Sequence, residues 1–215
     1  IRQHPVFAEL GFAVNAAGYI DHDQWHAIGA QVAVGATPLP RQCLLAEFVA
    51  RQALQQAGLV PADFSRAASG VFLGANKHCV SRDLQEASRY MDDAGSVDLD
   101  RYLDQHTLAG GPFARRIDQQ TWHIANLLGI RDHISTHSDA CAAGTMAIGS
   151  AFRAIERGEI DLAICGAVEL MAHELSYYSF DGLGAICQRA DLTAEQQSRP
   201  FMNDRCGFVL GEGAA

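Results

Sequence analysis

The stretch HISTHSDACAAGTMAIGSAFRAIERGEIDLAICGAV, residues 133–168, decides the fold class of this chain. It opens with a short β-prone run, continues with a helix-forming run that ends at Gly158, and closes with a continuous apolar run at 160–168. Such an apolar run is typical of a strand that is buried on both faces of a sheet. A strand, a helix and a second strand in this order predict a layered α/β fold with a mixed, largely parallel sheet.

The remaining sequence continues this alternation of elements. Apolar residues at helical spacing, followed by a glycine, predict helices over residues 41–59 and 114–130. The run SGVFLGA predicts a buried strand at 69–75, and the chain closes on a further apolar strand pattern. Residues 77–111 mix charge, glycine and short apolar pieces, so we expect an irregular insertion there, with some helix around 82–91.

The composition is that of a globular protein with a core, because 48% of the 215 residues are hydrophobic and 19% are charged. No apolar run approaches the roughly 18 residues that a membrane span needs, and the first residues lack the layout of a signal peptide. The formal net charge of -9 argues against nucleic acid or an anionic membrane as the main partner. We therefore expect a cytoplasmic protein that binds neither.

The cysteines are widely spaced and form neither a CxxC pair nor a Cys/His cluster with the spacing of a zinc site. We interpret all of them as reduced thiols, with no disulfide frame and no metal site. They are Cys43, Cys79, Cys141, Cys165, Cys187 and Cys206.

Cys141 differs from the other cysteines because it lies where a predicted strand passes into a predicted helix. Unpaired backbone N–H groups and the positive end of the helix dipole favour a thiolate at such a position. The small residues Ala142, Ala143 and Gly144 leave room for a substrate above the sulfur. The alternative is a small buried hydrophobic residue, the commonest fate of a free cysteine and the interpretation we favour for the other five.

Three segments in the same order and spacing resemble β-ketoacyl synthases, the condensing enzymes of fatty-acid and polyketide assembly. Residues 139–169 resemble the nucleophile segment, in which Ala-Cys and small residues precede a helix and a strand. The run SFDGLGAICQ at 179–188 resembles the next segment of the family. The run SRPFMNDRCGFVLGEGAA at 198–215 resembles the family's late Arg-Pro-Phe box, so the resemblance covers almost the whole chain.

The resemblance implies a thiolase-like fold, of which residues 1–215 would form the N-terminal half, a β-ketoacyl synthase N-terminal domain that is incomplete at both ends. The two catalytic histidines and the lysine of the family belong to the other half. His133 and His137 are therefore interpreted as packed or interface histidines, not as catalytic bases.

The resemblance also implies the chemistry of a 3-oxoacyl-carrier synthase. The Cys141 thiolate would accept an acyl group, and a malonyl-type thioester would then condense with it after losing carbon dioxide. The backbone N–H of Cys141 would form half of an oxyanion hole, Phe180 and Phe208 would line the acyl pocket, and Glu169 would be a structural hydrogen-bonding residue. No metal or bound cofactor is implied, since the substrates are carried on the phosphopantetheine of acyl carrier protein or coenzyme A.

Several residues depart from the family pattern. Asp139 stands where the family more often has Thr, and a carboxylate two residues from the nucleophile should oppose thiolate formation unless it is paired. Met202 and Cys206 replace the two Asp positions of the late box. The segment before residue 41 lacks the basic cluster with which many relatives dock the carrier protein, and Arg115 and Arg116 are the candidates to replace it.

Three alternatives stay open. Thiolases and initiating synthases share the fold and the cysteine, although they do not usually carry the late box. A non-catalytic partner subunit, similar to a chain-length factor, generally lacks the cysteine. The third alternative is a truncated chain without activity of its own. The family is dimeric, so we expect a homodimer or a heterodimer in which the strand HISTHSD pairs across the twofold axis.

Overall fold

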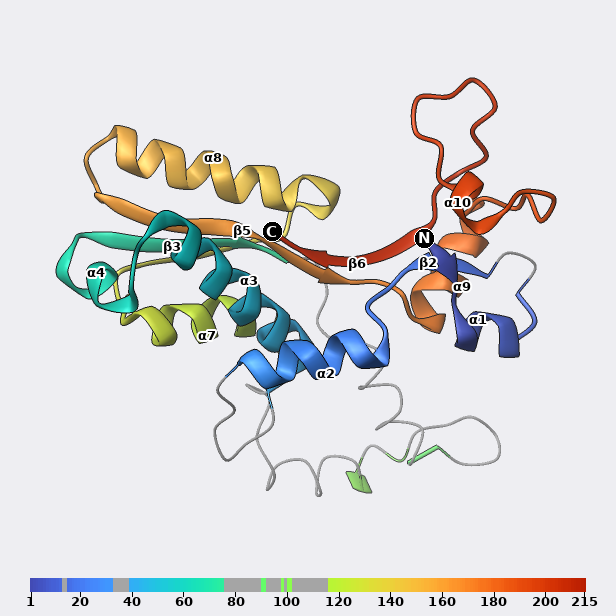
Figure 1. Cartoon of the computed structure of the whole chain (residues 1–215), viewed down its shortest axis with the longest axis horizontal. Coiled ribbons are helices and arrows are strands. Elements are labelled where there is room, and N and C mark those ends of the chain that lie inside the picture. Colours follow the sequence, from blue (N-terminus) through green and yellow to red (C-terminus); the bar gives the residue numbers. More distant parts are fainter. Residues whose placement is uncertain (13–14, 33–38, 76–89, 92–97, 99, 102–115) are drawn as a thin grey trace. The chain divides into compact units, whose positions relative to one another are not determined.

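The computed structural model describes residues 1–12, 15–32, 39–75, 90–91, 98, 100–101 and 116–215 (Figure 1). The chain forms two compact units: residues 1–25 with 169–213 make the smaller unit, and residues 26–168 with 214–215 make the larger. The helix expected around 82–91 lies mainly outside the described residues, and the assignment of 1–215 to one domain stays a prediction.

The larger unit contains a parallel sheet whose central strand is β3 (Ser69–Gly74). β3 pairs in parallel with β4 (His133–His137) on one side and with β5 (Leu162–Leu170) on the other. All residues of β3 are buried, as expected for a parallel strand that is covered on both faces. The parallel sheet predicted from the sequence is therefore confirmed.

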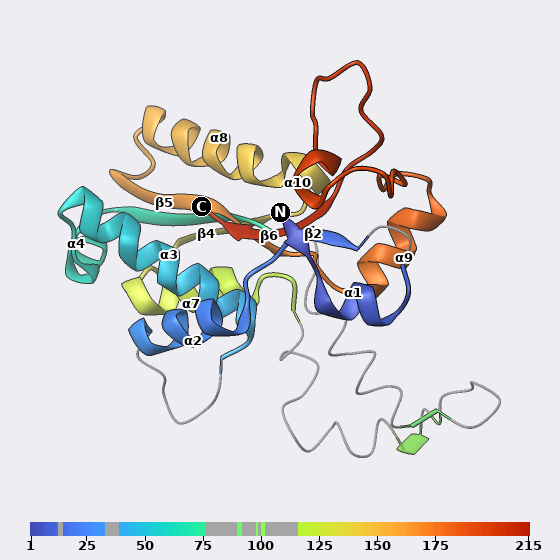
Figure 2. The same ribbon diagram turned by 45° about the vertical axis from the view of Figure 1, so that its right-hand side comes forward.

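Helices cover both faces of this sheet. Figures 1 and 2 show α8 (Ala143–Glu156) on one face, and α3 (Arg41–Ala57) and α7 (Gln119–Leu128) on the other. Two further helices, α2 (His22–Gln31) and α4 (Pro61–Arg66), precede α3 and β3.

The ends of α3 and α7 follow from their glycines. Gly58 and Gly129 both adopt left-handed φ, at 68° and 71°, which ends each helix in the way that glycine allows at low cost. The start of α7 differs from the prediction, because its first residue is Gln119. Asp118 accepts a hydrogen bond from Arg116 Nε at 2.8 Å, so this part of the chain forms a turn before the helix begins.

The face that α8 presents to the sheet consists of small side chains. The buried residues of α8 are Ala143, Ala147, Ala151 and Ala154. Its bulky apolar residues are exposed: Met146, Ile148, Phe152 and Ile155. Small side chains let the helix backbone approach the sheet closely, and a Cβ added at Gly144 would lie only 3.1 Å from the Cβ of Ala167.

A buried carboxylate joins α3 to α7. Glu47 of α3 accepts hydrogen bonds from Arg51 Nε at 2.8 Å and Nη2 at 2.6 Å. Its second oxygen lies 2.6 Å from Nε2 of His123, on α7. The side chain of Glu47 is only 3% exposed, so these partners offset the cost of removing its charge from water.

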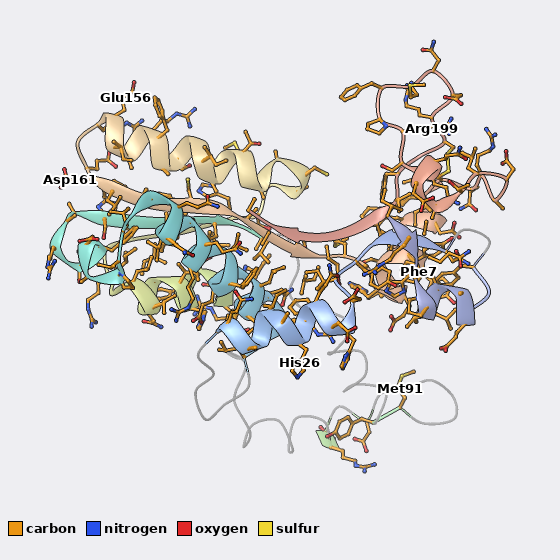
Figure 3. All side chains as sticks on the ribbon, viewed as in Figure 1. Phe7, His26, Met91, Glu156, Asp161 and Arg199 are labelled. Atoms are coloured by element: carbon orange, nitrogen blue, oxygen red, sulfur yellow. A yellow bond between two sulfur atoms is a disulfide. The ribbon has the colours of Figure 1, made fainter. Side chains whose placement is uncertain are left out.

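The smaller unit contains three further strands and a core of its own. β1 (Arg2–Gln3) runs antiparallel to β2 (Ala16–Gly18), and β2 runs parallel to β6 (Leu210–Ala214). Its helices are α1 (Pro5–Glu9), α9 (Glu174–Gly182) and α10 (Ala194–Gln197). The core surrounds the fully buried Phe7, labelled in Figure 3, and includes Ala17, Ala172, Tyr177, Ile186 and Leu210.

The expectation that all cysteines are reduced is wrong for two of them, because Cys187 and Cys206 form a disulfide. Backbone hydrogen bonds hold the segments 185–187 and 206–208 side by side, which brings the two Cα atoms to 4.7 Å. Cys43, Cys141 and Cys165 are free, and Cys79 lies outside the described residues.

No helix in the described ranges is both long enough and apolar enough to span a bilayer.

Candidate active site

A sharp turn between β4 and α8 positions Cys141. β4 ends at His137, a 3-10 turn covers Ala140–Ala142, and α8 begins at Ala143. Ala140 has a φ of 50°, in the left-handed region that residues with a side chain rarely adopt. The turn leaves Cys141 exposed at the start of the helix, as the sequence predicted.

A glycine in the neighbouring strand sets how close the start of α8 lies to the sheet. Gly74, the last residue of β3, is in register with His137 of β4. A Cβ added at Gly74 would lie 2.6 Å from both the carbonyl carbon of Ala143 and the amide nitrogen of Gly144. Only a residue without a side chain fits there, so Gly74 is a positioning residue that sequence reasoning missed. The signal available was a glycine at the end of the predicted strand.

The side chain of Asp139 has a partner. Its Oδ2 lies 3.7 Å from Nδ1 of His137, and the other ring nitrogen of His137 lies 3.3 Å from Ser135 Oγ. The side chain of His137 is 17% exposed and that of Asp139 is 48% exposed, so water weakens this interaction without removing it. His133, at the other end of β4, is in register with Gly70 and is half-buried.

The other free cysteines that the structure describes are poor nucleophiles. Burial, with a smaller effect from the charge of Glu47, raises the pKa of Cys43 to about 12. Burial also raises the pKa of Cys165, which lies in β5. Both therefore stay protonated near neutral pH, and Cys141 is the exposed free cysteine of the described chain.

The two phenylalanines predicted to line an acyl pocket contact each other in the smaller unit. Phe180 is on α9 and Phe208 precedes β6. Their ring centroids are 5.1 Å apart with the planes at 77°, an edge-to-face arrangement. The structure therefore brings together two residues of the predicted site, while Cys141 belongs to the larger unit.

The roles predicted for Glu169, Arg115 and Arg116 stay predictions. Glu169 lies half-buried in β5. Arg116 is exposed and pairs with Asp118, whose carboxyl has its pKa lowered by that guanidinium, while Arg115 lies outside the described residues. Across the described segments, no group of three or more His, Cys, Asp or Glu side chains is arranged to hold a metal ion.

A methyl group at Gly74 tests the close approach of β3 to α8. We expect Gly74→Ala to push the first turn of α8 away from the sheet and to lower the free energy of unfolding by about 1–3 kcal/mol, measured by urea denaturation. The rate at which iodoacetamide alkylates Cys141 should change with it. Gly149→Ala, also in α8, is the matched control, because a Cβ added at Gly149 has no neighbouring atom within 4 Å. An unchanged unfolding free energy in Gly74→Ala would contradict this interpretation.

The charge of Asp139 should slow the reactions of Cys141. Two like charges about 5–10 Å apart in water repel by roughly 0.4–0.8 kcal/mol, so Asp139→Asn should speed alkylation about two- to fourfold. The rate is measured by intact mass. Glu156→Gln, at the far end of α8, is the control and should react at the rate of the unsubstituted protein. Equal or slower alkylation of Asp139→Asn would rule out an electrostatic effect of this carboxylate.

Comparisons with known proteins identify the relatives of this chain. The family model described as "Beta-ketoacyl synthase, N-terminal domain" matches residues 13–215. The tetracenomycin polyketide synthase ketoacyl synthase alpha subunit of Streptomyces glaucescens is 32% identical over 182 residues, which cover 84% of this chain and 41% of that protein. The 3-oxoacyl-[acyl-carrier-protein] synthase 2 of Synechocystis is 47% identical over 75 residues, 35% of this chain and 18% of that one.

Two solved structures show that the fold is that of ketosynthases. A type II polyketide ketosynthase in complex with its acyl-carrier protein superposes with a TM-score of 0.74 at 24% identity, over 100% of this chain and 48% of the other. A β-ketoacyl synthase from Burkholderia phymatum gives 0.69 at 22% identity, over 99% and 50%. The chain spans about half or less of the length of these relatives.

Proposed function

Because the chain belongs to the β-ketoacyl synthase family, we propose that Cys141 accepts the acyl group in a decarboxylative Claisen condensation of fatty-acid or polyketide synthesis. The observation that carries the proposal is the exposed, free Cys141 in the turn between β4 and α8. The raised pKa values of Cys43 and Cys165 support the same choice, because a protonated thiol attacks a thioester slowly.

The proposed reaction has two steps. The Cys141 thiolate attacks the carbonyl carbon of an acyl thioester, a new C–S bond forms, and the carrier thiol leaves with a proton. A malonyl-type thioester then loses carbon dioxide, and its carbanion attacks the acyl carbon on Cys141. The cysteine leaves as a thiolate, and a 3-ketoacyl thioester is the product. The backbone N–H of Cys141, at a helix start, is proposed as one of the donors to the developing oxyanion.

Phe180 and Phe208 are proposed to bind the acyl chain. Phe208 is 41% exposed, so its ring offers apolar surface to a ligand as well as to Phe180. The substrates would arrive on the phosphopantetheine of acyl carrier protein or on coenzyme A, with no bound cofactor. The solved relative in complex with its acyl-carrier protein supports a carrier protein as the partner. We expect the protein to act in the cytoplasm.

Formation of one acyl adduct tests the nucleophile. The full-length protein, incubated with an acyl thioester, should gain the mass of one acyl group. Cys141→Ala should lose this adduct and Cys165→Ala should keep it, because burial holds the Cys165 thiol protonated. An adduct that persists in Cys141→Ala would overturn the assignment. The absence of any adduct in the full-length protein would favour the alternative of a non-catalytic partner subunit.

The edge of the sheet that β4 forms is the proposed dimer contact. Within the described residues β4 pairs only with β3, so its other edge is available for a strand of a second subunit. Small-angle scattering of the full-length protein should give the mass of a dimer. A monomer at the concentrations used for the activity measurement would contradict this proposal.

A further inference from the structure

Two short segments of the smaller unit lie side by side next to the aromatic pair. The N–H of Phe208 donates to the carbonyl of Ala185 at 3.0 Å, and the N–H of Cys187 donates to the carbonyl of Phe208 at 3.1 Å. Gly207, the residue between Cys206 and Phe208, has a φ of 118°, and a Cβ added there would lie 2.6 Å from the carbonyl oxygen of Ala185. The backbone of 206–208 therefore rests directly on the backbone of 185–187.

The Cys187–Cys206 disulfide fastens these two segments together. The bond closes the chain between residues 187 and 206, which contains α10 and the loop that projects beyond it in Figures 1 and 2. Phe201 in this loop is 99% exposed and has a φ of 66°, so the loop has little packing of its own. Cross-linking restricts the positions that such a loop can adopt.

The cross-link is close to the proposed acyl pocket. Phe208 follows Cys206 by two residues, and its ring packs edge-to-face on Phe180. Two backbone hydrogen bonds and the disulfide hold the segment that carries Phe208 at this point. Loss of the disulfide would leave the two hydrogen bonds as the links between these segments, and a segment held by fewer links opens more readily.

We propose that Cys187 and Cys206 form a redox-responsive site, at which a thiol or disulfide reagent sets how firmly Phe208 is held against Phe180. The effect on acyl transfer rests on the proposed function, because it assumes that Phe180 and Phe208 contact the acyl chain. The formation and opening of the cross-link do not depend on that function.

The chemistry is thiol–disulfide exchange with a small thiol as the reductant. Cys187 is fully buried and Cys206 is half-buried, so the thiolate of the reagent attacks the sulfur of Cys206. The S–S bond breaks, and Cys187 leaves as a thiolate and takes a proton. A second reagent thiol attacks the mixed disulfide, which frees Cys206 as a thiol and forms the reagent disulfide. Two electrons and two protons pass to the protein, and a disulfide reagent reverses both steps.

Thiol counting tests whether the site responds. The full-length protein is equilibrated in glutathione buffers of increasing reducing strength, quenched, denatured, and labelled with a maleimide. Intact mass should show two more labels in the reducing buffers than in the oxidising ones. Cys206→Ser should lose this difference, and Cys43→Ala should keep it because Cys43 is a free cysteine on α3. An equal number of labels across the series would overturn the proposal.

Hydrogen exchange tests whether the cross-link restrains the segment of Phe208. Reduction should speed exchange of the Phe208 and Cys187 amides by about tenfold. The amide of Tyr177, in α9 of the same unit, is the internal control, because it donates to the carbonyl of His173 just before that helix. Cys206→Ser should exchange at the rate of the reduced protein under both conditions. Unchanged exchange at the two amides would show that the disulfide does not restrain them, and would overturn the proposal.

Acyl transfer tests the consequence for the pocket. The protein is reduced with a phosphine, which is oxidised to its oxide while water supplies the oxygen and the two thiol protons, and the phosphine is then removed. The reduced protein should acylate Cys141 about tenfold more slowly with a long-chain thioester and at an unchanged rate with an acetyl thioester. Equal long-chain rates would overturn the coupling. If no thioester acylates Cys141, the proposed function fails, while thiol counting and exchange still decide the redox site.

Discussion

The candidate active site depends on a contact between backbones, at the point where the last residue of β3 meets the first turn of α8. Gly74 has no side chain, so the backbone of Ala143 and Gly144 can rest against the strand. The alanines further along α8 continue the same close approach, which is why the helix lies flat on the sheet. A helix held in this way has a fixed start. Cys141, two residues before α8, takes its position from that start and not from contacts of its own side chain.

Much of this arrangement can be predicted from the sequence, because it depends on local patterns. β3 and β5 appear as apolar runs and β4 as a β-prone run. Gly58 and Gly129 mark helix ends, since they supply the left-handed φ that ends a helix. The position of Cys141 follows from the same patterns. The disulfide cannot be predicted in this way, because Cys187 and Cys206 are 19 residues apart and meet only when two irregular segments pair.

The orientation of α8 is a second feature that hydrophobicity alone predicts poorly. Periodicity identifies an apolar face, and the usual expectation is that the bulkiest residues are buried. In α8 the short distance between the helix and the sheet determines which residues are buried. The space between them accepts alanine but has no room for Ile148 or Phe152. The pairing of Asp139 with His137 was within reach of sequence reasoning, since residues two apart on an extended segment point to the same side.

Ile148, Phe152 and Ile155 follow one another at helical spacing, so their exposed side chains form an apolar stripe beside the buried alanines of α8. Large apolar side chains are usually found inside proteins and not on their surfaces. Water therefore wets this side of the larger unit poorly, and contiguous apolar surface of this kind promotes self-association. The exposed apolar side chains of α8 therefore lower the solubility of the larger unit. The small residues on the opposite side of the helix stabilise the fold itself.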